Sequence, residues 1–152
     1  MEKYSKLLQI RWSDIDQNRH LRHSVYYDYG AMLRVAFLSE HGLTTEKLEE
    51  LKTGPILFRE EAIYKREVKM EDQITIDVEL VTTTPDYSRW SLRHNFTKQD
   101  GTIVAILNLD GAWMDIEKRK LTVPNELIQK IFNDFPKAID FQIKIKTSGG
   151  KK

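Results

Sequence analysis

Residues 24–38 read SVYYDYGAMLRVAFL, and this run contains only two charged side chains, Asp28 and Arg34. Its apolar residues cover nearly the whole circumference of a helix, and a helix without a polar face must be enclosed by other structure. We therefore expect a buried helix here. Ser24 would cap its N-terminus through the side-chain hydroxyl, and Gly42 would end it.

Alternating apolar and polar residues before and after this helix predict β-strands. Trp12 would lie on the buried face of the first strand, and Ile56, Phe58 and Tyr64 would share one face of the second. A later run is apolar on both faces, which predicts a central strand. The expected strands are residues 4–12, 54–68, 74–80, 89–96 and, at the centre, 102–116, and the expected short helices are residues 44–52 and 124–135.

The order of these elements is a strand, a loop, the buried helix and then four strands joined by short connections. Successive strands with short connections pair antiparallel. The simplest way to bury the helix is an α+β fold in which one antiparallel β-sheet wraps around it. Such a sheet leaves one side and an edge uncovered, so we expect a homodimer or homotetramer.

The length of 152 residues corresponds to one domain. We expect this domain to span residues 1–146. The end of the chain, residues 147–152, is predicted to be a disordered tail, because serine, glycine and lysine cannot bury enough apolar area to offset the chain entropy.

Composition excludes several classes of function. The 24 Lys and Arg residues against 23 Asp and Glu give a net charge of +1, which argues against a nucleic-acid binder. Without cysteine, disulfides, thiolate metal sites and a cysteine nucleophile are impossible. No apolar run approaches the roughly 20 residues of a membrane span, and the N-terminus lacks a secretory signal. We expect a cytoplasmic protein without a membrane partner.

Reactive side chains are concentrated in the loop directly before the buried helix. A helix N-terminus carries free amides and a partial positive charge, so it can hold a polarised carbonyl oxygen. A carboxylate beside it can act as nucleophile or as general base towards water. Together they supply the two parts that acyl hydrolysis needs. The loop side chains are Asp14, Asp16, Asn18, Arg19, His20, Arg22 and His23.

Two other interpretations of this loop stay open. Its charged residues and histidines are also what a solvated surface loop without chemistry would contain. A metal site is conceivable because Asp14, Asp16, His20 and His23 are closely spaced. The sequence lacks, however, the pair of histidines one turn apart on a helix that typifies such sites, so we expect no metal.

The loop and its surroundings resemble the opening signature of hotdog-fold acyl-CoA thioesterases of the 4-hydroxybenzoyl-CoA thioesterase type. That signature is approximately Asp-x-Asp-x-x-Gly-His-x-Asn-Asn, followed by a tyrosine-bearing helix that ends in arginine. The resemblance covers about residues 4–135. It is carried by Arg11-Trp12-Ser13-Asp14-Ile15-Asp16, His20-Leu21, Tyr26, Tyr29, Arg34, Gly54-Pro55 and Ile63-Tyr64-Lys65-Arg66.

This resemblance implies a hotdog fold and a hydrolase that cleaves acyl-CoA or acyl carrier protein thioesters without a cofactor. It implies that Asp16 is the catalytic carboxylate and that Asp14 is a structural acid. A backbone amide at the helix start, at His23 or Ser24, would hold the thioester carbonyl. The acid and part of the pocket would come from different subunits of a dimer.

Some positions depart from the family pattern. Arg19 stands where the family signature has a glycine before the histidine. Arginine disfavours the positive φ that glycine tolerates. Arg22 and His23 stand where the family signature has two asparagines, and Ala31 stands at a helix position that often carries an acid in relatives. These departures keep open a second function, a non-catalytic hotdog module that binds a ligand or assembles with partners. A dehydratase ranks last, because no histidine and acid are clearly paired for it.

The predicted substrate contacts follow from the chemistry of the carrier and of the acyl group. The phosphates of the carrier need positive charge, although surface lysines and arginines are also ordinarily solvated. The acyl group would lie between the helix and the partner subunit, where core packing explains the tyrosines equally well. The predicted substrate-binding residues are His20, Ser24, Tyr27, Pro55, Lys65, Arg66 and Arg89.

Overall fold

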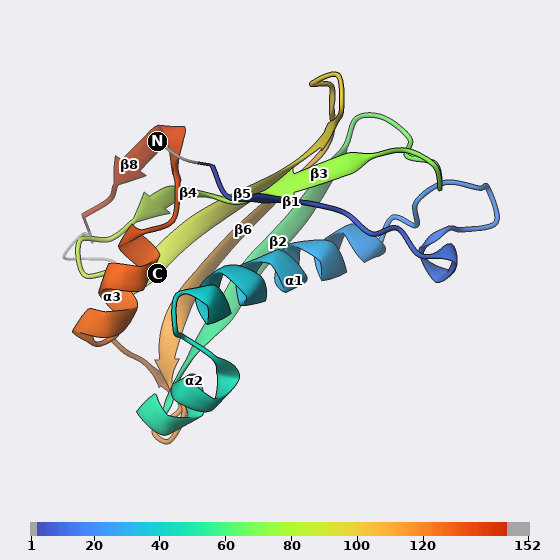
Figure 1. Cartoon of the computed structure of the whole chain (residues 1–152). Helices are drawn as coiled ribbons and strands as arrows, with labels where there is room; N and C mark the ends of the chain where they lie inside the picture. The colour runs from blue at the N-terminus through green and yellow to red at the C-terminus, as the bar shows by residue number, and fades with distance from the viewer. Residues whose placement is uncertain (1–2, 146–152) are drawn as a thin grey trace.

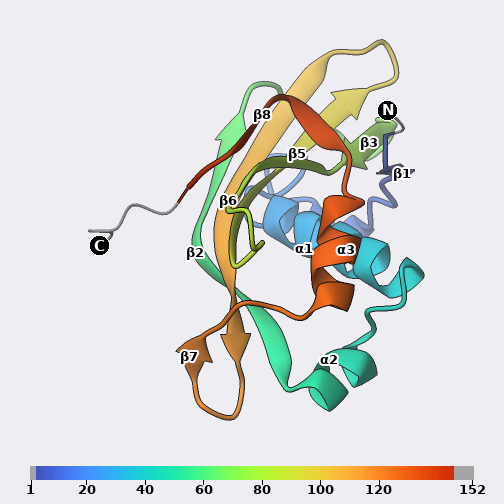
Figure 2. The ribbon, with the colours of Figure 1, turned by 90° about the vertical axis from the view of Figure 1, so that its left-hand side faces the viewer.

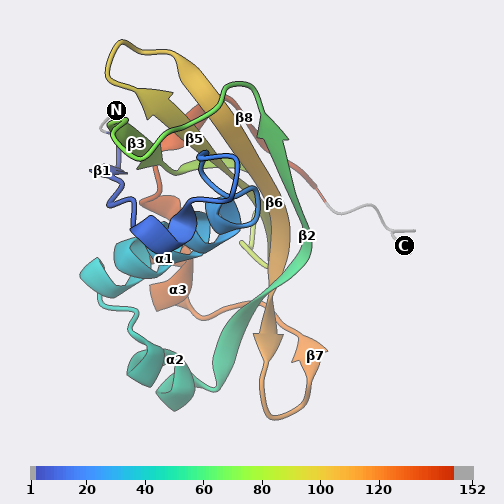
Figure 3. The same ribbon diagram turned by 90° about the vertical axis from the view of Figure 1, so that its right-hand side faces the viewer.

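The computed structural model describes residues 3–145, and within them eight strands form one sheet that curls around helix α1 (Figure 1). Figures 2 and 3 show α1 and α3 on the same side of this sheet. The strands are β1 (Ser5–Leu7), β2 (Thr53–Tyr64), β3 (Ile74–Asp77), β4 (Glu79–Thr83), β5 (Arg89–Lys98), β6 (Ile103–Asp115), β7 (Lys120–Leu121) and β8 (Lys137–Ile143). The helices are η1 (Trp12–Asp14, a 3₁₀ turn), α1 (Val25–Glu40), α2 (Thr45–Leu51) and α3 (Glu126–Asn133).

The predicted α+β class and the wrapped antiparallel sheet are confirmed. Strand β6 is central, as predicted, because it pairs with β2 on one side and with β5 on the other. Strand β5 then pairs with both β3 and β4. The predicted tail at residues 147–152 lies outside the described residues. None of the helices within residues 3–145 has the length and apolar character needed to cross a membrane.

The expectation that all successive strands pair is wrong between β2 and β3. The chain leaves β2 and passes the N-terminal end of α1, where the Leu21 amide donates to the Val68 carbonyl at 2.7 Å. This crossing puts β2 on one flank of the helix and β3 on the other. The helix is thereby covered from both flanks, which adjacent pairing would not achieve.

Strand β8 was not predicted from the sequence. This strand runs parallel to β4. Hydrogen bonds hold it at both ends, because the Leu80 amide donates to the Pro136 carbonyl and the Lys144 amide donates to the Thr83 carbonyl. Most of its side chains are exposed. Because the strand buries little apolar surface, its own sequence carries a weak signal.

The prediction that α1 is enclosed on all sides is wrong for its outer face. Met32 is 68% exposed and Val35 is 49% exposed, whereas Leu33 and Phe37 are buried against the sheet. The sheet of a single chain reaches only part of the helix circumference. The end of the helix is as predicted, because Gly42 has φ +94° and its amide donates to the Ser39 carbonyl.

Two predicted strand faces are also corrected. The first strand ends at Leu7, and Trp12 begins η1 with 84% of its surface exposed. In β2 a bulge between Leu57 and Arg59 shifts the alternation of side chains. Phe58 therefore lies on the outer face, 5.4 Å beneath the Arg89 guanidinium. Ile56 is on the same outer face, because it pairs with Ala112, which in turn pairs with Arg89. Neither residue shares the helix-side face of Tyr64.

Helix α1 lies close to the sheet at Gly30. A Cβ atom at this position would lie 2.6 Å from Leu107 Cδ2 and 3.1 Å from His94 Cδ2. Contacts of 2.6 Å are well inside the van der Waals separation of two carbon atoms. A side chain at this position would therefore force Leu107 or the helix to shift.

A buried polar contact lies beside this approach. Arg34 Nη1 is 2.9 Å from His94 Nε2, and His94 Nδ1 is 2.8 Å from the Asp77 carbonyl oxygen. Because a carbonyl only accepts, Nδ1 carries the proton and Nε2 accepts from Arg34. Burial, and then the Arg34 charge, lower the pKa of His94 to about 3. His94 is therefore neutral at physiological pH.

We predict that Gly30→Ala destabilises the protein by about 1–3 kcal/mol through overpacking, although alanine favours an isolated helix by about 1 kcal/mol. Urea unfolding measures the change. Gly54→Ala is the control, because a Cβ there meets its nearest atom, Ile116 Cδ1, at 3.4 Å. An unchanged or higher stability of Gly30→Ala would show that the helix does not pack this closely.

The buried His94 predicts acid sensitivity. Between about pH 6.5 and pH 3 the unfolded chain binds a proton at this histidine that the folded chain refuses. Stability therefore falls as the pH drops through this window, with a slope approaching about 1.4 kcal/mol per pH unit. Urea unfolding at several pH values measures the slope. His94→Gln keeps a neutral acceptor for Arg34 and should reduce the slope of stability against pH. A slope as steep as in the wild type would show that protonation of His94 does not cause the acid sensitivity.

Candidate functional site

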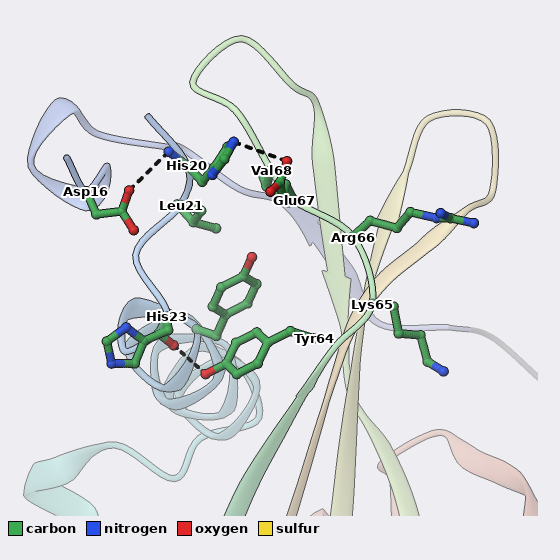
Figure 4. A pocket seen from close by; sticks show the side chains of 10 residues that line it. Asp16, His20, Leu21, His23, Tyr64, Lys65, Arg66, Glu67 and Val68 are labelled. Atoms are coloured by element: carbon green, nitrogen blue, oxygen red, sulfur yellow. Dashed lines mark hydrogen bonds and ion pairs between the residues drawn. The ribbon is translucent and has the colours of Figure 1, made fainter. Parts of the chain in front are cut away.

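A cavity of about 530 Å³ lies between the loop before α1, the start of α1 and the end of β2 (Figure 4). It brings together five of the predicted site residues, although these are far apart in the sequence. Its lining residues are Asp16, His20, Leu21, His23, Tyr26, Tyr64, Lys65, Arg66, Glu67 and Val68.

Asp16 uses one carboxylate oxygen to hold its own loop. Oδ1 accepts the amides of Asn18 at 2.9 Å and of His20 at 3.3 Å. Within residues 3–145, Oδ2 has no hydrogen-bond partner. Figure 4 shows the side chain directed from the loop towards the interior of the cavity. The loop therefore fixes the carboxylate and leaves one oxygen free for a ligand or a water molecule.

Asp14 has the structural role that the resemblance implied. It is fully buried, and its carboxylate accepts the Arg11 amide at 3.0 Å, the Arg11 guanidinium at 3.1 Å and the Tyr29 hydroxyl at 2.6 Å. Burial alone raises the pKa of Asp14, but the hydrogen bonds from Tyr29 and Arg11 outweigh it and hold the pKa below its ordinary value. The two acids of the loop thus differ in environment, and only Asp16 faces the cavity.

The start of α1 presents backbone donors beside the cavity. No hydrogen bond in the described part of the chain engages the amides of His23 and Ser24. The predicted side-chain cap is wrong, because Ser24 has helical backbone angles and its hydroxyl accepts Arg22 Nη1 at 2.7 Å. The His23 carbonyl accepts the Tyr64 hydroxyl at 2.7 Å. An anionic or carbonyl oxygen at this position would meet free N–H groups.

Arg19 preserves the loop shape that glycine would supply. Its φ is +68°, in the left-handed region, and its amide donates to the Asp16 carbonyl at 2.9 Å. The Asp16 amide in turn donates to the His20 carbonyl at 2.9 Å. The backbone therefore closes a tight turn around Asp16 in spite of the substitution, at a strain cost of about 1 kcal/mol or more.

The remaining cavity residues form its walls. His20 Nε2 lies 3.2 Å from Glu67 Oε1. Lys65 and Arg66 have no ion-pair partner within residues 3–145, and Figure 4 shows both side chains extending away from Asp16. Tyr64 and Glu67 were not predicted as site residues, because only the passage of the chain after β2 over the loop brings them there.

Four predicted substrate contacts lie elsewhere in the same chain. Ser24 and Tyr27 do not line the cavity, although Tyr27 lies beside Tyr64 and, after burial, helps to raise the pKa of that tyrosine. Arg89 lies over Phe58 on the outer face of the sheet. Pro55 lines a second cavity. The substrate-binding roles of these four residues stay predictions.

The second cavity, called here the Arg34 cavity, has a volume of about 200 Å³ and lies between α1, β2, β5 and α3. Its walls are apolar except for the guanidinium of Arg34. Its lining residues are Ala31, Arg34, Val35, Leu38, Pro55, Leu57, Trp90, Leu92, Phe132 and Phe135. Residues 3–145 contain no group of three or more His, Asp or Glu side chains arranged to hold a metal ion.

The sequence and the fold have counterparts among known proteins. Residues 10–131 match the family model described as the thioesterase-like superfamily. A comparison with curated proteins gives no match. Among solved structures, the Staphylococcus aureus protein SAV2348, studied in complex with CoA, is 21% identical with a TM-score of 0.78, and the match covers 99% of this chain and 94% of that one.

Two thioesterases share the fold at lower identity. The 1,4-dihydroxy-2-naphthoyl-CoA thioesterase Slr0204 from Synechocystis is 11% identical, with a TM-score of 0.77 over 88% of this chain and 97% of that one. The DHNA-CoA thioesterase from S. aureus is 10% identical, with a TM-score of 0.76 over 88% of this chain and 90% of that one. These likenesses confirm the predicted hotdog arrangement.

Proposed function

The chain belongs to the thioesterase-like superfamily of hotdog-fold enzymes, and we propose that it hydrolyses acyl-CoA or acyl carrier protein thioesters in the Asp16 cavity. One observation carries this proposal. A fixed carboxylate with a free oxygen and the unengaged backbone amide of His23, at the start of α1, belong to residues that line the same cavity. These are the two parts that hydrolysis of a thioester requires.

In the proposed reaction the thioester carbonyl oxygen accepts a hydrogen bond from the amide of His23, which lines the cavity. This bond strengthens as negative charge develops on the oxygen, and the positive end of the helix dipole adds to it. Asp16 Oδ2 either takes a proton from the attacking water or attacks the carbonyl carbon itself, forming an anhydride that water then opens. In both routes the carbon–sulfur bond breaks, the thiolate gains a proton, and one water is consumed. The carboxylate and the amide supply this chemistry without a cofactor.

The proposed site is shared between two copies of the chain. Within residues 3–145, β2 pairs only with β6, so a long edge of backbone donors and acceptors is left open. Two-fold pairing of two β2 edges is antiparallel. It places Pro55 and Leu57 of one copy near Tyr64 of the other, and all three side chains lie on the helix side of the sheet. The Arg34 cavity of one copy then adjoins the Asp16 cavity of its partner.

The carrier is bound by positive charge at the rim. Lys65 and Arg66 carry charges that no acid within residues 3–145 neutralises, and phosphate groups are recognised by such cations. The solved relative SAV2348 was studied in complex with CoA. The non-catalytic alternative rests on the departures at Arg19, Arg22 and Ala31, and predicts that acyl-CoA raises the melting temperature without thiol release.

We predict that Asp16→Asn lowers the rate of thiol release from acyl-CoA by about 10²–10⁴-fold, the loss typical of a positioned acid or base. Asparagine retains the oxygen that accepts the Asn18 and His20 amides, so the loop should keep its shape. Thermal unfolding checks this. Asp28→Asn, on the exposed side of α1, is the control and should keep wild-type turnover. Wild-type turnover in Asp16→Asn would exclude this carboxylate as the catalytic group.

A shared site predicts complementation between two inactive variants. Asp16→Asn removes the acid, and Val35→Trp enlarges a half-exposed side chain that lines the Arg34 cavity and so narrows that cavity. Co-expression with two affinity tags isolates the heterodimer, in which one of the two sites carries both changes and the other carries neither. We expect about half of the wild-type activity per dimer. A heterodimer as inactive as both homodimers, or a monomer in sedimentation, would contradict a shared site.

A further inference from the structure

We propose that His20 is a further catalytic residue, which gives a proton to the sulfur atom as the thiol departs, and that Glu67 positions it. This inference rests on the proposed hydrolysis and adds the source of the proton that the thiolate gains. Three observations lead to it. His20 lies beside Asp16 in the loop, Glu67 holds one nitrogen of the His20 ring, and the other ring nitrogen is unused.

The backbone of the loop places His20 beside Asp16. Ile15 and Leu21 form an antiparallel bridge, and the Asp16 amide donates to the His20 carbonyl at 2.9 Å. Asp16 and His20 are thus the next opposite pair towards the turn. Opposite residues of antiparallel segments direct their side chains to the same face, with Cβ atoms about 5 Å apart. Both residues line the cavity, so a thioester that reaches the Asp16 carboxylate also lies within reach of the His20 ring.

Glu67 fixes the direction of the His20 ring. His20 Nε2 lies 3.2 Å from Glu67 Oε1. Figure 4 shows the imidazole between the Asp16 loop and Glu67, with the contact to Glu67 on the side away from Asp16. Nδ1 has no hydrogen-bond partner within residues 3–145, and it is the ring nitrogen nearer to the backbone. It is therefore the atom of the ring that is available to a substrate bound at Asp16.

A histidine held in this way can supply the proton. Histidine takes up and releases a proton near neutral pH. In the protonated ring both nitrogens carry hydrogen, so Nε2–H donates to Glu67 while Nδ1–H donates to the sulfur. As the carbon–sulfur bond breaks, its electron pair stays on the sulfur, which takes the proton from Nδ1. His20 recovers a proton from the attacking water, either through Asp16 or, if an anhydride forms, when water opens it.

The other proton donors that line the cavity suit this step less well. Burial raises the pKa of the Tyr26 phenol to about 12, so this hydroxyl releases its proton reluctantly. The side chains of Lys65 and Arg66 extend away from Asp16 (Figure 4). His23 is exposed, and no side-chain hydrogen bond or ion pair within residues 3–145 orients its ring. His20 is thus the donor that is both titratable and held in place.

The test separates proton donation from a purely structural role of the His20–Glu67 pair. It compares two thioesters of the acyl group that the wild type releases fastest from CoA, one with N-acetylcysteamine and one with 4-nitrothiophenol. The first thiolate is about as basic as that of cysteine and leaves with the help of a proton, whereas the nitro-substituted aryl thiolate leaves without one. We expect His20→Gln to lower kcat/KM for the first thioester by about 10²-fold or more and for the second only slightly.

The readout is the ratio of the two kcat/KM values within one protein, which does not depend on the folded fraction. His41→Gln is the matched control and should keep the wild-type ratio, because His41 lies at the other end of α1, where its Nδ1 is 2.8 Å from the Phe37 carbonyl oxygen. Glu67→Gln should shift the ratio in the same direction as His20→Gln but by less, and an unchanged ratio would remove Glu67 from this role.

Two further outcomes separate this inference from the proposed hydrolysis. Equal losses for both thioesters in His20→Gln would overturn proton donation by His20 and leave the hydrolase in place. A wild-type protein that releases no thiol from any acyl-CoA or acyl carrier protein would overturn the hydrolysis, and the role of His20 with it.

Discussion

Helix α1 and the sheet meet at Gly30 with no room for a methyl group between them. This contact fixes how far the helix lies from the sheet and how it is rotated about its own axis. Arg34, one turn later, can then reach His94 across the interface. The same rigid helix carries its first amides to the Asp16 loop. The geometry of the site is therefore set by packing further along the helix, and the residues of the loop only complete it.

The parts of the fold that could be predicted from the sequence are those encoded by local patterns. The apolar run predicted α1 over 25–38, and the helix spans Val25–Glu40. Thr44 caps α2 by accepting the Lys47 amide, as a threonine before a helix suggests. The bulge at Leu57, the exposure of Met32 and the parallel strand β8 depend on which segment lies opposite. These are tertiary contacts, and no periodicity in a single segment specifies them.

The candidate site divides in the same way. Asp14 and Asp16 were distinguished by the resemblance, and the structure supplies a physical basis, since Tyr29 and Arg11 enclose one acid and leave the other at the cavity. Arg19 shows that a sequence departure need not be a structural one, because its backbone keeps the conformation of the glycine that it replaces. Tyr64 and Pro55 lie on one strand yet line different cavities. In the proposed dimer, a second copy of that strand, running the opposite way, would bring the two cavities together.

The hydrogen bond from Tyr64 to the His23 carbonyl also determines the direction of a neighbouring group. His23 and Ser24 share one planar peptide unit, in which C=O and N–H point in opposite directions. The Ser24 N–H is therefore aimed away from the phenol ring. The preceding unit is held in turn, because the Val25 amide donates to the Arg22 carbonyl at 3.0 Å and so orients the His23 N–H. Both N–H groups are thus held in fixed directions, and that of His23 belongs to a residue that lines the cavity.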